Sequence, residues 1–239
     1  MIHPQFAPLV RGAAFQRLLA RTQRIIDAML DVSRTPYVAF SAGKDSSVLL
    51  ALVRAARPDV IAIYTDDEWR LPETDELLAA TPNLRRVARP VAHTEWFTAH
   101  ADGPPADAEW LEDVPAWGRG LGYDGAFVGL RAEESRARRV LLHSRGPLFW
   151  NARRHSWQCC PLRDWTTQDI WAYIQAWDVP YNRAYDVLAQ LGVPITAQRI
   201  GPLAVERVPG RGQLAILRQG WPELWNRFAA AHPEARAYL

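Results

Sequence analysis

Apolar and polar positions follow two different periods along the first part of the chain. Apolar side chains recur at the spacing of one helix face over residues 13–31, with arginines between them. Residues 37–40 are apolar throughout and lead into a glycine-containing turn, which is typical of a buried strand. The same reasoning predicts strands at residues 60–64, 84–91 and 126–130 and helices at residues 46–57, 72–80 and 131–142.

This strand–helix alternation predicts an α/β fold with a doubly wound, mostly parallel sheet and helices on both faces. Ligands of such sheets bind beyond the carboxyl ends of the strands. The loops after Phe40, Tyr64 and Leu130 are therefore expected to meet at one crevice. Residues 101–125 are rich in Gly, Pro and Asp, so we expect a loop or a lid there.

The last third of the chain has a different character. Residues 161–190 form a Trp- and Tyr-rich segment with helical spacing, and residues 192–212 contain Gly and Pro breaks. Residues 213–239 are expected to be helical. We therefore expect an α/β domain over residues 1–190 and a mostly helical C-terminal extension over residues 191–239.

The overall composition argues against several classes of protein. A net charge of +2 among 239 residues gives no global argument for binding nucleic acid or a membrane. Arginines interrupt the N-terminal region, so neither a secretory signal nor a membrane span is expected. Two cysteines cannot form a disulfide framework, and we expect a cytoplasmic protein with reduced thiols. Most of the 11 Trp residues are expected to anchor the core or a subunit interface, and a homodimer is one expected assembly.

The segment 41–47, Ser-Ala-Gly-Lys-Asp-Ser-Ser, connects the first predicted strand to the next helix. Gly43 is expected to adopt a conformation closed to other residues, so that main-chain amides and the helix dipole point at one anion. Ser46 and Ser47 would add hydroxyl donors, and Lys44 a mobile positive charge. Lys44 is the only lysine among 28 basic residues, which favours a compact charge in a tight phosphate cradle. The alternative is an ordinary capped helix after a strand.

Carboxylates accompany this loop. Asp45 would repel phosphate unless it binds a magnesium ion or caps the helix. Asp66, Asp67 and Glu68 follow the second predicted strand and face the same crevice. Magnesium accepts carboxylate and phosphate oxygens together, which makes Asp45, Asp66 and Asp67 the candidate metal ligands. For residues 66–68 the alternative is helix capping before Pro72.

The loop resembles the Ser-Gly-Gly-Lys-Asp-Ser signature of the PP-loop ATP pyrophosphatase (adenine nucleotide α-hydrolase-like) superfamily, with Ala42 in place of the first glycine. Other segments resemble the phosphoadenosine phosphosulfate reductase family. Residues 64–74 contain Tyr-Thr-Asp-Asp-Glu and Leu-Pro-Glu-Thr, and residues 129–138 read Gly-Leu-Arg-Ala-Glu-Glu-Ser-Arg-Ala-Arg. Residues 161–166, Pro-Leu-Arg-Asp-Trp-Thr, begin a further block. The segments run in the family's order over residues 36–186.

The resemblance implies a PP-loop domain that binds ATP with magnesium, or phosphoadenosine phosphosulfate (PAPS) or adenosine phosphosulfate (APS). It implies attack at the α-phosphate of ATP, which gives pyrophosphate and an adenylylated intermediate. The implied catalytic residues are Lys44, Asp45 and Arg131. The implied nucleotide-binding residues are Ser41, Ala42, Gly43, Lys44, Asp45, Ser46, Ser47, Thr65, Asp66, Gly129 and Arg131.

The sequence departs from the reductases of this family at their nucleophile. Those enzymes use a cysteine in a C-terminal Glu-Cys-Gly segment, whereas this chain has no cysteine after Cys160. Cys159 and Cys160 cannot supply the four ligands of an iron–sulfur cluster, so none is expected. We therefore predict an ATP pyrophosphatase, with sulfur transfer such as DNA phosphorothioation as its role. Three alternatives stay open: a sulfonucleotide reductase that uses Cys159 or Cys160, an FMN adenylyltransferase, and a nucleotide-sensing subunit without catalysis.

A dense group of arginines follows the fourth predicted strand. It is able to bind a second anion, such as a sulfonucleotide, a tRNA or a DNA backbone. The alternative for its helical members is a solvated basic face. Protein partners in a sulfur-transfer or DNA-modification system are also expected. The group consists of Arg131, Arg136, Arg138, Arg139, Arg145, Arg153 and Arg154.

Overall fold

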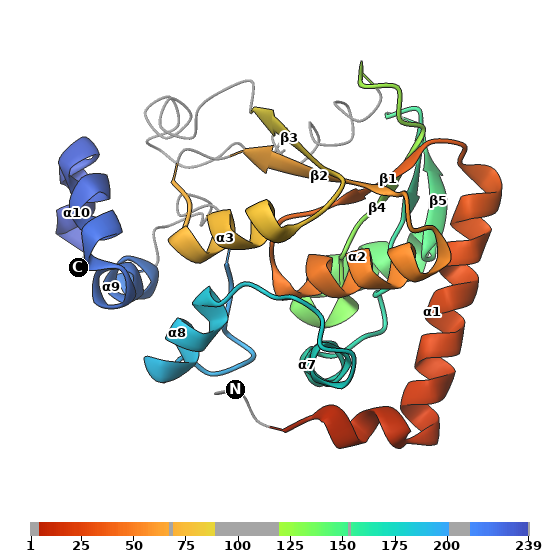
Figure 1. The fold of residues 1–239 in the computed structure, drawn as a ribbon, viewed down its shortest axis with the longest axis horizontal. Helices are drawn as coiled ribbons and strands as arrows, with labels where there is room; N and C mark the ends of the chain where they lie inside the picture. The colour runs from red at the N-terminus through yellow and green to blue at the C-terminus, as the bar shows by residue number, and fades with distance from the viewer. Residues whose placement is uncertain (1–4, 67–68, 89–119, 153, 201–210, 239) are drawn as a thin grey trace.

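A six-stranded sheet runs through the part of the chain that the computed structural model describes, residues 5–66, 69–88, 120–152, 154–200 and 211–238 (Figure 1). The strand order is β3-β2-β1-β4-β6-β5, and every neighbouring pair is parallel except β5 with β6. The predicted α/β fold with a doubly wound, mostly parallel sheet is confirmed. The strands are β1 (Pro36–Ala39), β2 (Ile61–Asp66), β3 (Leu84–Ala88), β4 (Gly125–Phe127), β5 (Leu148–Asn151) and β6 (Ser156–Cys159).

Helices connect and cover these strands. The apolar side of α2 is buried through Val48, Leu49 and Val53, which belong to the large core cluster together with Val38 of β1. In Figure 1, α2 and α3 cross in front of the sheet, and α1 stands beside β5. The helices are α1 (Ala13–Val32), α2 (Lys44–Ala56), α3 (Pro72–Ala80), α6 (Arg136–Arg145), α7 (Thr167–Ala176), α8 (Ala184–Gln190), α9 (Arg211–Gly220) and α10 (Pro222–Ala231), with 3-10 turns η1 (Ala7–Arg11), η2 (Ala132–Glu134) and η3 (Pro233–Tyr238).

The sheet reverses its strand order at β1. β2 and β3 lie on one side of β1, whereas β4, β6 and β5 lie on the other. Tyr37 of β1 is thus paired with Ile61 of β2 and with Ala126 of β4. Because ligands of such sheets bind where the order reverses, beyond the carboxyl ends of the strands, the segments after β1 and β4 border the expected crevice.

The end of α1 lies very close to β4 at Gly125. A Cβ atom at this glycine would stand 2.3 Å from Cε of Met29 and 2.5 Å from Oγ of Ser33. Asp124 fixes the same junction, because its carboxylate accepts from the Ser33 hydroxyl (2.5 Å) and from the main-chain N–H of Thr35 (2.9 Å). Glycine at this position therefore lets the helix that precedes β1 pack directly against the neighbouring strand.

Several predicted elements have different bounds in the structure. The helix expected from residue 46 begins at Lys44, and the strand expected to end at residue 130 ends at Phe127. The single helix expected over residues 131–142 is divided into η2 and α6. Ser135 causes the division, because it is extended (φ −163°, ψ 159°) and its hydroxyl accepts from the N–H of Arg138 to cap α6.

The sequence analysis did not predict the hairpin of β5 and β6. Each strand has four residues, which is too short for a clear period of two. The hairpin depends on cross-strand pairs such as Trp150 with Trp157, whose ring centroids are 5.4 Å apart. The strand expected at residues 84–91 is described as β3, and most of the loop expected at residues 101–125 lies outside the described residues.

Within the described residues, the C-terminal extension is helical from Arg211 onward, as predicted. Trp221 and Trp225 belong to the same apolar cluster as the sheet, and the Trp221 indole N–H donates to the Glu73 carboxylate of α3 (2.9 Å). The division at residue 190 stays a prediction. Within the described residues, no helix is both long and apolar enough to cross a membrane.

Candidate functional site

The turn between β1 and α2 contains one strained residue, and it is not the expected one. Ala42 has φ 57°, in the left-handed region that favours glycine. Gly43 is extended (φ −82°, ψ 160°), a conformation open to any residue. The expectation that Gly43 supplies the special conformation is therefore wrong, because the reversal of the chain falls one residue earlier. Gly43 gives space instead: its Cβ would lie 3.3 Å from Oγ of Ser41.

Hydroxyl groups hold the turn together from within. Oγ of Ser46 donates to the Gly43 carbonyl (2.9 Å) and accepts from the main-chain N–H of Ser41 (3.2 Å). The first amides of a helix have no partner inside the helix, which here leaves those of Asp45 and Ser46 at the start of α2. Both residues line a cavity of about 930 Å³. The turn therefore offers main-chain donors and the positive end of a helix to an anion.

Tyr185 of α8 contacts the turn at Lys44. Its hydroxyl accepts from the main-chain N–H of Lys44 (3.2 Å), and the ammonium group of Lys44 lies 5.6 Å from its ring centroid. Burial raises the pKa of Tyr185 above its ordinary value, so the hydroxyl stays neutral. Tyr185 was not predicted as a site residue, because no local pattern shows that it reaches the loop.

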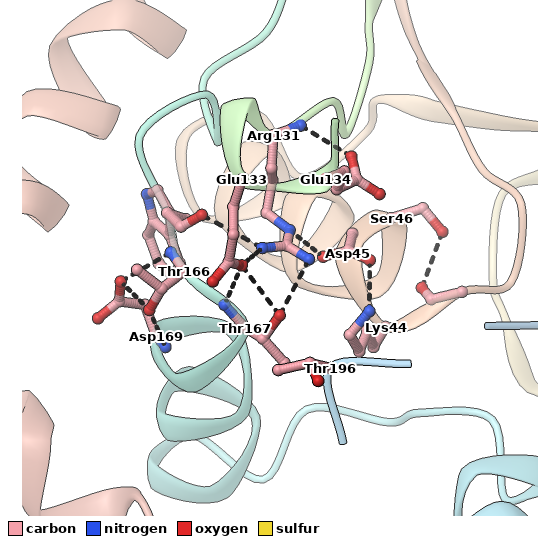
Figure 2. A network of polar contacts seen from close by, with 12 residues as sticks. Lys44, Asp45, Ser46, Arg131, Glu133, Glu134, Thr166, Thr167, Asp169 and Thr196 are labelled. Carbon is pink, nitrogen blue, oxygen red and sulfur yellow. Dashed lines mark hydrogen bonds and ion pairs between the residues drawn. The ribbon is translucent and has the colours of Figure 1, made fainter. Parts of the chain in front are cut away.

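A closed network of charges lies beneath the turn (Figure 2). Nζ of Lys44 is 2.9 Å from one oxygen of Asp45, and Nε of Arg131 is 2.6 Å from the other. Arg131 also pairs with Glu133, whose carboxylate accepts from the main-chain N–H of Thr167 (2.7 Å). The side chains of Lys44 and Arg131 are each 1% exposed. Lys44 is therefore a fixed charge, and Arg131 joins the first turn of α2 to the first turn of α7.

The network changes the pKa values of its members. Burial alone would raise the pKa of Asp45, but the charges of Lys44 and Arg131 outweigh it and hold that pKa below its ordinary value. Burial lowers the pKa of Lys44 more than Asp45 raises it, and nearby Arg131 and Arg199 lower it further. Burial also opposes the charge of Arg131, yet its carboxylate partners raise its pKa overall. Asp45 and Arg131 are thus held in their charged forms.

A cavity of about 930 Å³ opens in front of the turn and extends between β4 and α3 toward the β5–β6 hairpin. Four implied site residues do not line it: Ala42 and Ser47 are buried in the turn and α2, Arg131 lies beneath the turn, and Asp66 pairs with Arg70 and Arg86. The implied site residues that line it are Ser41, Gly43, Lys44, Asp45, Ser46, Thr65 and Gly129.

The described carboxylates do not fit a magnesium site. Both oxygens of Asp45 are in contact with cationic side chains, and the oxygens of Asp66 pair with Arg70 and Arg86. A divalent ion on either carboxylate would be repelled by the cationic side chains already in contact with it. Asp67, the third metal candidate, lies outside the described residues. We therefore derive no chemical step through magnesium.

The two cysteines lie at the end of β6, away from the cavity wall. Cys159 and Cys160 are both buried, and neither lines the cavity. Burial raises the pKa of Cys160 to about 12 and also raises that of Cys159. Since the thiolate is the reactive form, these positions fit packing better than attack on a sulfonucleotide.

The arginine group is divided by the structure. Arg138, Arg145 and Arg154 line the cavity on the side of α6 and of the β5–β6 hairpin, and β5 is the edge strand three positions from β1, whereas Arg136 and Arg139 are exposed on α6. Arg153 lies outside the described residues. A further cation, Arg199, lines the cavity. The sequence analysis missed Arg199, because it lies in a Gly- and Pro-broken segment with no motif around it.

Comparisons with known proteins point to one family. The model of the phosphoadenosine phosphosulfate reductase domain matches residues 35–188. Phosphoadenosine 5′-phosphosulfate reductase of Xanthomonas axonopodis pv. citri is 28% identical over 184 residues, which cover 70% of this chain and 73% of that protein. Sulfate adenylyltransferase subunit 2 of Burkholderia lata is 30% identical over 200 residues, which cover 71% of this chain and 67% of that protein.

A solved structure shares the fold. The phosphate complex of phosphoadenylyl-sulfate reductase from Candida auris superposes with a TM-score of 0.56 at 20% identity, over 81% of this chain and 95% of that one. At this identity the likeness shows the fold alone. The family model, in contrast, covers more than half of the 239 residues and all the segments around the turn. The chain belongs to the phosphoadenosine phosphosulfate reductase domain family.

Proposed function

We propose that the chain is a PP-loop enzyme that binds the triphosphate of ATP at the 41–47 turn and cleaves it at the α-phosphate. The observation that carries this proposal is the start of α2, where the first amides have no partner inside the helix and where Asp45 and Ser46 line the cavity. An anion there meets fixed donors that need no rearrangement when charge develops. The family relation supports an adenine nucleotide as the ligand.

The proposed reaction is transfer of AMP. A nucleophilic oxygen of the acceptor attacks the α-phosphorus and forms an acceptor–AMP bond. The bond between the α-phosphorus and the oxygen that bridges to the β-phosphate breaks, and pyrophosphate leaves with its electron pair. A hydroxyl acceptor gives its proton to solvent. The main contribution of the protein is to hold the leaving group, since charge accumulates on pyrophosphate.

The turn alone does not balance the charge of a triphosphate. Lys44, Asp45, Arg131 and Glu133 form a group with two positive and two negative charges. Arg199 supplies a further positive charge beside the turn. Among the described residues, its guanidinium donates only to main-chain carbonyls of its own segment, at 3.3 and 3.4 Å. We propose that Arg199 contacts the polyphosphate and that Arg131 is a positioning residue, which acts through Asp45 and Lys44.

The relatives support sulfur metabolism as the setting. One is named for adenylyl transfer to sulfate and another for reduction of a sulfonucleotide. The buried cysteines give no support to a reductase, and an adenylylated acceptor suits a later attack by a sulfur donor. We propose sulfur transfer, with DNA phosphorothioation as a candidate, as the process that the adenylylation serves.

The products of labelled ATP test the proposal. AMP or acceptor-bound AMP together with pyrophosphate is expected by mass spectrometry, and Lys44→Ala should lower the rate by about 10²–10³-fold. Arg57→Ala, at the exposed far end of α2, is the matched control and should keep the rate of the unaltered chain. Release of ADP and phosphate would contradict the mechanism.

The alternatives predict other outcomes in the same material. FAD formed from FMN and ATP would identify an FMN adenylyltransferase. Thiol-dependent sulfite production that is lost when Cys159 and Cys160 are both changed to serine would identify a reductase. Tight ATP binding without turnover in the presence of sulfate, FMN and nucleic acid would identify a nucleotide sensor.

A further inference from the structure

We propose that the end of the cavity opposite the turn binds single-stranded nucleic acid, and that this strand is the acceptor of the AMP group. The surface consists of Arg138, Arg145, Phe149, Trp150 and Arg154, all of which line the cavity, and we name it the arginine–aromatic face. The acceptor role rests on the proposed function, whereas binding of the strand does not.

The charge of this region stands out from the rest of the chain. The 29 residues from 135 to 163 contain seven arginines and no aspartate or glutamate, although the whole chain has a net charge of only +2. A local excess of arginine of this size attracts a polyanion by releasing its condensed counterions. The balanced charges beneath the turn cannot do this, because each cation there has a carboxylate partner.

The arginines of α6 lie on different faces of the helix. Arg138 and Arg145 are seven positions apart, so they lie near one another around the helix, and both line the cavity with Leu141. Arg136 and Arg139 are exposed and do not line it. Among the described residues, Arg145 has no acidic partner, and its guanidinium carbon lies 5.4 Å from the ring centroid of Phe149. Arg138 pairs with Glu134, so Arg145 is the member of this face whose positive charge has no acidic partner among the described residues.

Aromatic rings lie beside these charges. Trp150 is 48% exposed although it is the partner of Trp157 across the β5–β6 hairpin. The two rings meet edge-on at 5.4 Å and an interplanar angle of 72°, which fixes Trp150 without covering it. An exposed, fixed ring beside arginines matches the way proteins hold single strands, in which bases stack on aromatic side chains and cations follow the phosphates.

The two ends of one cavity fit the two substrates of an AMP transfer. The turn and the arginine–aromatic face line the same cavity of about 930 Å³. Val128, Gly129 and Leu130 also line it, and they follow β4, which lies between β1 and β6 in the sheet. A nucleotide on the turn and a strand on the arginine–aromatic face would therefore approach each other beside β4, the neighbour of β1, at which the strand order of the sheet reverses.

Binding is tested with the full chain by fluorescence anisotropy, with a labelled oligo(dT) and an abasic oligonucleotide of equal length. The affinity of the unaltered chain should fall steeply with salt. Arg145→Ala should lower the slope of log affinity against log salt by roughly 0.7. Trp150→Ala should weaken oligo(dT) by about tenfold and leave the abasic strand unchanged, because only the first can stack.

Arg227→Ala is the matched control. Arg227 is an exposed arginine of α10, which lies at the other end of the molecule from β5 in Figure 1, so its loss should change neither slope nor affinity. Binding that is insensitive to salt, an equal loss in Arg227→Ala, or an equal loss for both oligonucleotides in Trp150→Ala would overturn the proposal. Because Arg145 and Trp150 are exposed, their variants are expected to fold, which thermal unfolding checks.

The acceptor role is tested by pyrophosphate release from ATP with and without oligo(dT). Acceleration by the strand that Trp150→Ala loses supports it. Release that the strand leaves unchanged overturns the acceptor role and leaves the proposed function standing. Absence of release with every acceptor contradicts the proposed function, and the anisotropy data then decide separately whether the arginine–aromatic face binds nucleic acid.

Discussion

The two ends of the cavity carry positive charge in opposite ways. At the turn, Lys44 and Arg131 are almost fully buried, and each contacts Asp45. At the arginine–aromatic face, Arg145 is exposed and rests on an aromatic ring. Buried paired charges are costly to separate, so they hold elements in place, whereas exposed unpaired charges are available to a ligand. The charges at the 41–47 turn therefore hold that part of the cavity rigid. A cation without an acidic partner among the described residues, Arg145, lies at the arginine–aromatic face.

The largest test of this comparison removes Arg131. Arg131→Met leaves the buried carboxylate of Asp45 with one cation, and the free energy of unfolding should fall by about 3–5 kcal/mol in urea denaturation. Arg138→Met, which breaks the more exposed pair with Glu134, is the control and should cost at most about 1 kcal/mol. Equal small losses in both variants would mean that the turn does not depend on the buried network.

The second test removes Arg199. Arg199→Ala should lower kcat/KM for ATP by roughly 10–100-fold, because a hydrogen bond to a charged group contributes about 1.5–3 kcal/mol. The free energy of unfolding should not change, since Arg199 is exposed and, among the described residues, its side chain donates hydrogen bonds only to carbonyls of its own segment. Steady-state kinetics and urea denaturation measure the two effects, with Arg218→Ala of α9 as the control. A loss of stability without a loss of activity would assign Arg199 to the scaffold.

The third test uses pH. The pKa of Asp45 is lowered in the folded chain, so its stabilising effect is complete above the unfolded value of about 3.9 and is lost as the pH falls through the folded pKa. Across that acidic window one proton changes the stability by about 1.4 kcal/mol per pH unit. The stability of Asp45→Asn should depend less steeply on pH there than that of the unaltered chain. Parallel pH curves from urea denaturation would contradict the charged state of Asp45.

The smallest test concerns the strain in the turn. Ala42→Gly should relieve a left-handed conformation that costs about 1–2 kcal/mol, offset by about 0.5–1 kcal/mol of added freedom in the unfolded chain. A net gain of up to about 1 kcal/mol is expected in thermal or urea unfolding. Ala51→Gly in the interior of α2 is the control and should lose about 0.5–1 kcal/mol. A loss in Ala42→Gly of the same size as in the control would show that the turn is unstrained.

Elements whose pattern lies within one segment could be predicted from the sequence, whereas elements that depend on contacts between segments could not. The early strands and helices were placed correctly because their apolar periods are strong within single segments. The β5–β6 hairpin was missed because its stability comes from pairing between two short strands, as between Trp150 and Trp157. The break at Ser135 was missed because a hydroxyl cap outweighed a pattern compatible with one continuous helix.

The candidate site shows the same division. The turn was found because glycine, lysine and three serines stand where a buried strand passes into a helix. The left-handed conformation was expected at Gly43 but occurs at Ala42. A glycine in the sequence shows where the chain is flexible and not which residue adopts the left-handed conformation. Tyr185 and Arg199 were missed because neither belongs to a motif that contacts phosphate.

The start of a helix directly after a buried strand could be predicted from the sequence, and so could the main-chain amides beside Lys44, the only lysine. These features depend on a few adjacent residues. Which charged side chains pair with one another depends on the tertiary structure. Arg131 meets Asp45 across 86 residues of chain, and Tyr185 meets Lys44 across 141. Burial and ion pairing are set by the approach of distant segments, so no local pattern separates Arg131, which fixes the scaffold, from Arg145, which has no acidic partner among the described residues.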